Sequence, residues 1–238
     1  MKKQLIASLL GLTIASSSFA AMVIEGTRVV YKGKDKEVIV RMTNQGQVPL
    51  VVQSWVDGGE KDKDKMPEDI QVPFQITPPI SRVDPGKGQA LRIFYTAGQD
   101  LAQDKETLFW FNVLEIPPKA KATEDNTIFF TIRSRLKFFY RPSTIAADIP
   151  SNITDKLSFS KAVEDGKSVI KVTNASPYFM TFAQGEFEGG GKLAGGMVAP
   201  MQSTTLAAEK GNLADAKNLK MMYINDSGAN ISFDAKLK

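Results

Sequence analysis

The sequence predicts an all-β protein built from two β-sandwich domains. Three observations support this: short apolar runs of strand length, turn residues between them, and almost no apolar pattern of helical period. The chain has 238 residues, of which 42% are hydrophobic and 24% charged, so it is globular and long enough for two domains. The predicted strand-bearing runs are 37–44, 49–59, 74–95, 107–118, 126–142, 156–163, 168–174, 178–187, 203–208, 219–226 and 230–237.

The first 20 residues are predicted to form a secretory signal peptide. Lys2 and Lys3 precede an apolar run that extends from Leu5 to Ile14, and SSSFA then supplies a small-residue site with cleavage expected after Ala20. The apolar run is too short to cross a bilayer comfortably, and no other stretch approaches that length. We therefore expect an exported protein with no membrane insertion.

Composition excludes several functions. The chain contains no Cys and no His, so disulfides, thiol nucleophiles, His bases and His/Cys zinc sites are impossible. Removing residues 1–20 takes away two lysines and no acids, so the formal net charge falls from +4 to +2. Nucleic acid is a poor partner for such a balanced surface. Composition leaves only carboxylate, Lys or Tyr chemistry for an enzyme. From the motifs along the chain we expect no catalytic residue, no metal and no cofactor.

The sequence also predicts the domain boundaries and several loops. The first domain is predicted at 21–142 and the second at 150–238, with the aperiodic stretch 143–152 between them. Two proline pairs, at 78–79 and 117–118, end strand patterns, and the sequence leaves open whether either contains a cis bond. The charged run 59–69 is predicted to be a solvated hairpin loop. The glycine-rich run 185–196 lacks the spacing of a phosphate loop, so a flexible hairpin loop is expected there.

The run 126–142, NTIFFTIRSRLKFFYRP, combines two patterns. Ile128, Phe130 and Ile132 alternate as in a half-buried strand, whereas the second half is basic and aromatic. Residues five apart on an unbroken strand point to opposite faces, so Ile132 and Lys137 should do so. Arg133 and Arg135 are expected to be solvated charges at a sheet edge.

Several motifs, taken in order behind a signal peptide, resemble those of the periplasmic pilus chaperones of the PapD type. They are GTRVVY (26–31), Asn44, Trp55, TPPISRVDPGKGQALRI (77–93), ETLFWFNVLEIPP (106–118), RLKFFYRP (135–142) and YINDSGA (223–229). The resemblance covers essentially the whole mature chain. It implies two immunoglobulin-like β-sandwich domains in a boomerang arrangement. The short segment 119–125 is similar to that of the short-loop branch, which assembles rod-like pili.

The resemblance also implies a function and its residues. The family binds pilus subunits (pilins) in the periplasm by donor-strand complementation, prevents their aggregation and delivers them to an outer-membrane usher without ATP. Motif matches assign the donor positions to Ile128, Phe130 and Ile132, and the anchor for the pilin C-terminal carboxylate to Arg28 and Lys137. They assign an interdomain salt-bridge network to Glu106, Arg141 and Asp226. Self-association of the free protein is a further expectation, because the donor strand leaves an apolar edge exposed.

Two other functions remain open at this point. An exported immunoglobulin-like adhesion or ligand-binding protein would have the same strands but would bind through its loops. A carboxylate-pair hydrolase would need two acids that face each other, and Glu106 and Asp226 are the candidates for that pair.

Overall fold

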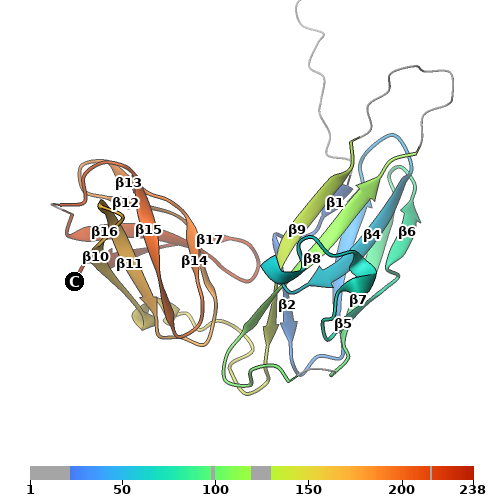
Figure 1. Ribbon diagram of the computed structural model, residues 1–238, viewed down its shortest axis with the longest axis horizontal. Helices are drawn as coiled ribbons and strands as arrows, with labels where there is room; N and C mark the ends of the chain where they lie inside the picture. Colours follow the sequence, from blue (N-terminus) through green and yellow to red (C-terminus); the bar gives the residue numbers. More distant parts are fainter. Residues whose placement is uncertain (1–21, 98–99, 119–129, 215) are drawn as a thin grey trace, which may run out of the picture.

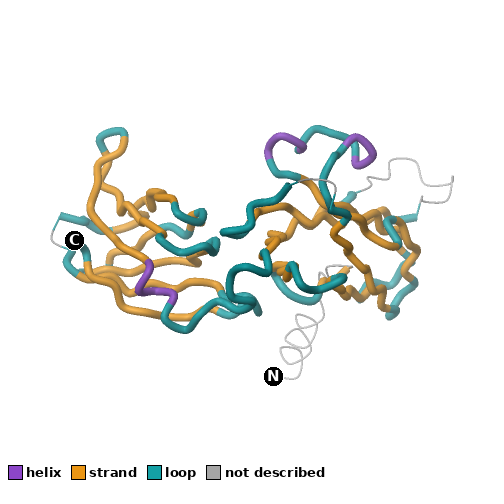
Figure 2. The backbone as a smooth tube through the Cα atoms, turned by 90° about the horizontal axis from the view of Figure 1, so that it is seen from below, coloured by secondary structure: helices purple, strands orange, loops and turns teal. Residues whose placement is uncertain are grey.

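The computed structural model describes residues 22–97, 100–118, 130–214 and 216–238, and shows two all-β lobes side by side (Figures 1 and 2). In the first lobe, one sheet has the order β1 (Met22–Ile24), β3 (Val38–Asn44), β7 (Gly88–Tyr95), β5 (Phe74–Thr77). The other has the order β2 (Arg28–Lys32), β9 (Ile132–Arg141), β8 (Thr107–Ile116), β4 (Leu50–Asp57), β6 (Ile80–Val83). Alternating apolar residues explain this sandwich, because every second side chain of a strand faces the space between the sheets.

The core of the first lobe fills that space with aromatic and β-branched side chains. Phe111 and Phe138 are fully buried there, and Phe74 packs edge-on against Phe138 with ring centroids 4.7 Å apart. Large aromatic rings bury much apolar area and prefer such edge-to-face contacts. This packing fixes the position of β9, which supplies Phe138 to the core.

The second lobe consists of one eight-stranded sheet that folds over its own core. Its order is β10 (Leu157–Glu164), β11 (Lys167–Asn174), β15 (Gln202–Lys210), β13 (Gly191–Leu193), β12 (Met180–Phe187), β16 (Asn218–Ile224), β17 (Asn230–Lys236), and β14 (Gly196–Val198) pairs with β12. A parallel bridge between Phe159 and Leu237 brings the two ends of this path together. Ile170 and Met221 are fully buried inside.

Among the described residues, three short 3₁₀ helices lie outside the sheets: η2 (Glu60–Asp62), η3 (Pro67–Asp69) and η4 (Ile153–Lys156). In the described part of the chain, none of the helices is long and apolar enough to cross a membrane. The stretch 143–152 contains no strand, and β9 ends at Arg141 just before it. Of the two proline pairs, the described bonds include one cis peptide, between Thr77 and Pro78.

Two loop predictions are wrong in part. The run 59–69 contains η2 and η3, and Asp62 is buried there. Its carboxylate accepts hydrogen bonds from the Gly58 N–H and from Lys65 Nζ, each at 2.8 Å, and these bonds compensate the burial of its charge. The run 185–196 includes β13, which pairs with both β12 and β15. Pairing with the neighbouring strands β12 and β15 stabilises this short strand, and its glycine-rich composition gave no strand signal.

Candidate functional site

The candidate site is centred on β9, which lies on the side of the first lobe that faces the second (Figure 1). On one side β9 pairs antiparallel with β8, from Ile132 opposite Glu115 to Tyr140 opposite Thr107, without a register shift. On the other side it pairs in parallel with β2, but only from Lys137 to Arg141. The edge of residues 132–136 therefore has no strand partner in the described ranges. The N–H and C=O groups that point outward from this edge form no ladder with a described strand.

The two faces of β9 differ. Leu136, Phe138 and Tyr140 point into the core of the first lobe, and Ile132 lies on the same face beyond them. Ile132 is 51% exposed, and Phe130, just before the strand, is 76% exposed. Because the register is unbroken, Lys137 points to the opposite face from Ile132. The third predicted donor residue, Ile128, and the segment 119–125 lie outside the described residues.

Arg28 and Lys137 lie opposite each other, at the first paired position of β2 and β9. Both side chains are half-buried and reach the second lobe. Arg28 Nη1 donates to the Ile224 carbonyl at 2.9 Å, and Lys137 Nζ lies 3.4 Å from Thr181 Oγ1. Neither cation forms a salt bridge with any described residue, and Arg28 Nε is buried without a hydrogen-bond partner.

Holding the charges of Arg28 and Lys137 side by side in a half-buried position is electrostatically unfavourable. Burial lowers the pKa of Lys137, and the neighbouring Arg28 charge lowers it further. Burial also lowers the pKa of Arg28, although the negative charges of Asp226 and Glu106 oppose the shift. Two desolvated cations side by side favour an anion, and a carboxylate fits both donors. The arrangement can therefore bind a carboxylate.

Arg141 connects the two lobes. Its guanidinium bonds to Glu106 Oε1 at 2.7–2.8 Å and to both carboxylate oxygens of Asp226 at 2.8 and 2.9 Å. Arg141 and Glu106 are each 1% exposed, and Asp226 is 31% exposed. Glu106 Oε2 also accepts the Phe179 N–H at 2.7 Å. The structure thus brings the three predicted network residues together, with one cation between two acids.

Burying the charged groups of this network costs free energy, which their pairing offsets. Burial raises the pKa of Glu106, while the Arg141 charge and the Phe179 N–H act in the other direction. Since Arg141 separates the two carboxylates, Glu106 and Asp226 do not face each other across open space. This geometry gives the hydrolase alternative no support.

Further contacts at the junction were not predicted. Arg141 stacks on the Tyr178 ring at 5.0 Å, and the Tyr178 hydroxyl donates to the Ala146 carbonyl. Phe139 packs on Phe179, with ring centroids 5.5 Å apart. Tyr178 and Phe179 begin the predicted strand run 178–187, and nothing in the sequence marks them as junction residues. Only their position beside β9 reveals a role.

Arg133 and Arg135 are partly exposed, but each forms an ion pair, so the prediction of solvated edge charges is wrong in part. Both bond to Asp57 on β4: Arg133 Nη2 to Oδ2 at 3.1 Å, and Arg135 Nη2 to Oδ1 at 2.7 Å. Asp57 is completely buried and also accepts the Asn112 amide at 2.8 Å. The strand order β9-β8-β4 places these residues on one sheet face, and sequence spacing alone could not relate position 57 to position 133.

Two tryptophans cover the same cluster. Arg133 lies over Trp55 at 4.8 Å, and Arg135 lies over Trp110 at 4.4 Å, measured to the ring centroids. Arg133 Nε additionally donates to the Asn112 side-chain oxygen at 2.9 Å. Cation–π contacts and charged hydrogen bonds together hold both guanidinium groups in place. We call Asp57, Asn112, Arg133, Arg135, Trp55 and Trp110 the arginine–tryptophan cluster.

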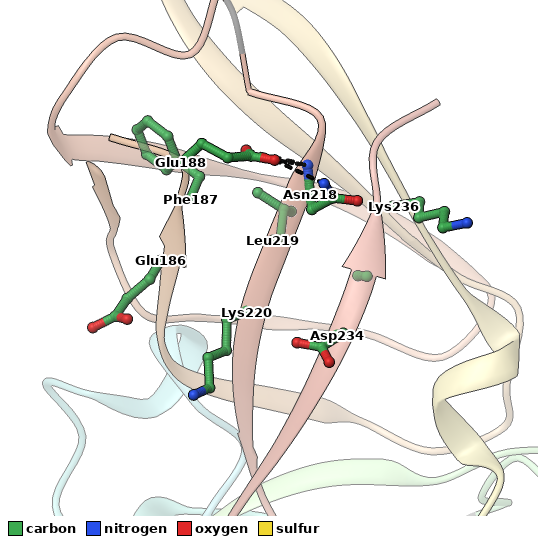
Figure 3. Close-up of a pocket in the computed structure, with 9 residues that line it drawn as sticks. Glu186, Phe187, Glu188, Asn218, Leu219, Lys220, Asp234 and Lys236 are labelled. Carbon is green, nitrogen blue, oxygen red and sulfur yellow. Dashed lines mark hydrogen bonds between the residues drawn. The ribbon is translucent and has the colours of Figure 1, made fainter. Parts of the chain in front are cut away.

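A hollow of about 510 Å³ lies elsewhere, on the second lobe over β12, β16 and β17 (Figure 3). Glu186, Lys220 and Asp234 are successive cross-strand neighbours there, so opposite charges alternate across the sheet. Glu188 caps one end by accepting hydrogen bonds from Asn218. The hollow contains none of the predicted site residues. Within the described chain, no group of three or more acidic side chains is arranged to hold a metal ion.

Comparison with known proteins agrees with this geometry. A family model described as "Pili and flagellar-assembly chaperone, PapD N-terminal domain" matches residues 21–146. A second, "Pili assembly chaperone PapD, C-terminal domain", matches residues 152–235.

Relatives match along nearly their whole length. The probable fimbrial chaperone YadV of Escherichia coli K12 is 39% identical over 233 residues, which is 95% of this chain and 94% of that protein. The chaperone protein FimB/FhaD of Bordetella pertussis is 39% identical over 232 residues, covering 94% and 91%.

Solved structures give the same result. A crystal structure of the YadV chaperone superposes with a TM-score of 0.76 at 36% identity, covering 91% of this chain and all of that one. The Salmonella enterica SafB chaperone, in complex with the SafA pilin, has a TM-score of 0.76 at 25% identity, covering 93% and 99%.

Proposed function

The chain belongs to the PapD-type family of pili-assembly chaperones, and on this premise we propose that it captures pilus subunits along the free edge of β9. The family consists of chaperones rather than enzymes. The observation that carries the proposal is the half-paired strand: residues 132–136 have no strand neighbour on one side among the described residues, and this edge ends at Arg28 and Lys137. A subunit that lacks one strand gains main-chain hydrogen bonds by pairing there.

Exposed apolar side chains at the start of the strand supply the second part of the interaction. Phe130 and Ile132, together with Ile128 before them, are lent to the core of the captured subunit. Fully burying one such side chain contributes about 1.5–3 kcal/mol. Without the complex, these side chains of the chaperone and the core of the subunit would both face water. The complex therefore protects each protein from aggregation.

Arg28 and Lys137 anchor the C-terminal carboxylate of the subunit. Both cations are half-buried and lack an acidic partner among the described residues, so the negative charge of a carboxylate between them offsets the cost of their desolvation. Register matters because a shift of one residue would turn every donor side chain to the wrong face. A fixed chain end sets that register.

The salt-bridge network holds the two domains, 21–142 and 150–238, at a constant angle. Arg141 bonds to Glu106 in the first domain and to Asp226 in the second. A buried network of this kind specifies geometry more than it adds stability. It keeps Arg28 and Lys137 beside Ile224 and Thr181, and so preserves the anchor.

The chaperone works in the periplasm and passes subunits to an outer-membrane usher. Cleavage after Ala20 releases the mature chain, so mass spectrometry of the periplasmic protein should show an N-terminus at Ala21. Before capture, the apolar edge of β9 favours self-association of the free protein.

Co-expression tests the anchor. With a pilus subunit encoded in the same gene cluster, the wild-type chain should form a one-to-one periplasmic complex, whereas Arg28→Ala and Lys137→Ala should form none. Arg82→Ala is the matched control, because Arg82 is exposed on β6 of the same sheet and pairs only with the exposed Asp84 among described residues. All variants should keep the wild-type circular dichroism. Intact complexes with both anchor variants would refute the anchoring role.

A further inference from the structure

Glu115 is a buried carboxylate that the capture site does not use. It shares the inward face of β8 with the core residue Val113, and only 5% of it is exposed. Its neighbours on the adjacent strands are Val52 on β4 and Ile132 on β9, which are both apolar. Among the described residues, Glu115 has no ion-pair partner. A carboxylate in such a position is costly unless it is hydrogen-bonded and paired with a cation.

The start of β1 contacts this carboxylate. The Met22 N–H donates a hydrogen bond to Glu115, and Met22 is itself 5% exposed and pairs with Asn44 on β3. Because β1 and β8 belong to different sheets, this bond joins the two sheets of the first lobe. Burial raises the pKa of Glu115, the Met22 N–H opposes the shift, and no charge of a described residue contributes. One neutral donor compensates a buried carboxylate only in part.

A cation for Glu115 stands next to Met22 in the mature chain. Cleavage after Ala20 leaves Ala21 as the first residue, and its α-amino group is protonated below a pKa of about 7.7–8.0. Ala21 lies outside the described residues, and the family model for the first domain begins its match there. Standard bond lengths keep the nitrogens of consecutive residues within about 4 Å of each other. Rotation about the Ala21 ψ bond therefore suffices to bring the ammonium group to the carboxylate that Met22 contacts.

We propose that the α-ammonium group of Ala21 forms a salt bridge with Glu115, so that removal of the signal peptide completes the first lobe. In the precursor, an uncharged peptide N–H occupies the position of the ammonium group, and Glu115 has no counterion there. Glu115 is then a positioning residue, which holds the start of β1 to the sheet that carries β9. It does so opposite Ile132, where the donor edge begins. This inference rests on the cleavage after Ala20 proposed above.

The test measures the pKa of the Ala21 amino group in the intact protein purified from periplasm. Mass spectrometry first determines the residue at which the chain begins. Nuclear magnetic resonance then follows the Ala21 methyl group in protein labelled with carbon-13 alanine as the pH is raised. The salt bridge should raise this pKa by about 1–3 above its ordinary value of about 7.7–8.0, and Glu115→Gln should return it to that value. An ordinary pKa in the wild-type chain would overturn the proposal.

Stability gives a second measurement. Three glycines inserted after Ala20 keep Met22 and Glu115 but move the charged chain end away from them. At about pH 6.5, where the amino group is protonated, the insertion should raise the equilibrium constant for urea unfolding about tenfold, as one pKa unit implies. In the Glu115→Gln chain the insertion should have little effect, whereas in the matched control Glu25→Gln, which changes an exposed acid just after β1, it should act as in the wild type. Equal destabilisation in all three chains would contradict the salt bridge.

Failure of the premise looks different from failure of the inference. A mature chain that begins at another residue, as seen by mass spectrometry, would overturn the cleavage site and the salt bridge together. A chain that begins at Ala21 and has an ordinary amino-group pKa would overturn the salt bridge alone. Capture along β9 is measured by co-expression, and neither result decides it.

Discussion

Arg141→Met is expected to destabilise the protein by removing the cation between two acids. Methionine has a similar length and fills the buried space, so the main effect is electrostatic. Glu106 is 1% exposed and would keep only the Phe179 N–H as a partner, whereas Asp226 is 31% exposed and can be hydrated. Most of the cost therefore falls on Glu106.

The magnitude follows from this difference in burial. Breaking a buried ion pair by removing one partner costs about 3–5 kcal/mol. A second variant, Arg141→Met with Glu106→Gln, also removes the stranded charge but keeps an oxygen for the Phe179 N–H. Because the net contribution of a buried pair is small, the double variant should lose only about 1–2 kcal/mol.

Urea unfolding followed by far-ultraviolet circular dichroism measures both variants, and small-angle X-ray scattering reports the separation of the domains. We expect the single variant to unfold at lower urea and to have a broader distribution of domain distances. A single variant that loses less than about 1 kcal/mol, or a double variant as unstable as the single one, would refute this account of the network.

Other predictions concern capture and local stability. Because the pKa of Lys137 is lowered, its ammonium group loses a proton at a lower pH than that of an ordinary lysine. Capture should therefore weaken as the pH rises through that lowered pKa. An affinity that stays constant up to the ordinary lysine pKa would contradict this. Phe130→Ser should change the free energy of unfolding by less than about 0.5 kcal/mol, because the side chain is exposed, yet it should reduce complex formation. Phe111→Ala, at a fully buried site, should instead cost about 3–5 kcal/mol in urea unfolding. Asp57→Ala should cost about 2–3 kcal/mol by the same measurement, since two arginines and an amide lose their acceptor.

The all-β architecture and most strands could be predicted from local pattern. Alternation in runs such as 107–118 identifies a strand wherever one face is buried, because the period of two is a local property of the chain. The exceptions are short elements such as β13, whose glycine-rich sequence has no strand pattern and whose stability depends on pairing with β12 and β15.

The residues of the functional site, too, could be predicted only in part from the sequence. Motif resemblance identified Arg28, Lys137 and the members of the salt-bridge network, and the structure places Arg28 beside Lys137 and Arg141 between its two acids. The ion pairs of Arg133 and Arg135 could not be predicted, because their partner Asp57 is 76 and 78 residues away in the chain.

Composition and short motifs thus account for the fold class, the absence of thiol and imidazole chemistry, and the family. Apolar alternation, charge and turn residues are local features of the sequence, and they can be recognised without knowing which segments pack beside them. The free edge of β9, the half-buried state of Lys137 and the pairing of Asp57 with two arginines depend on which strands become neighbours. Those properties arise from long-range contacts, so the three-dimensional arrangement of the sheets is what assigns them.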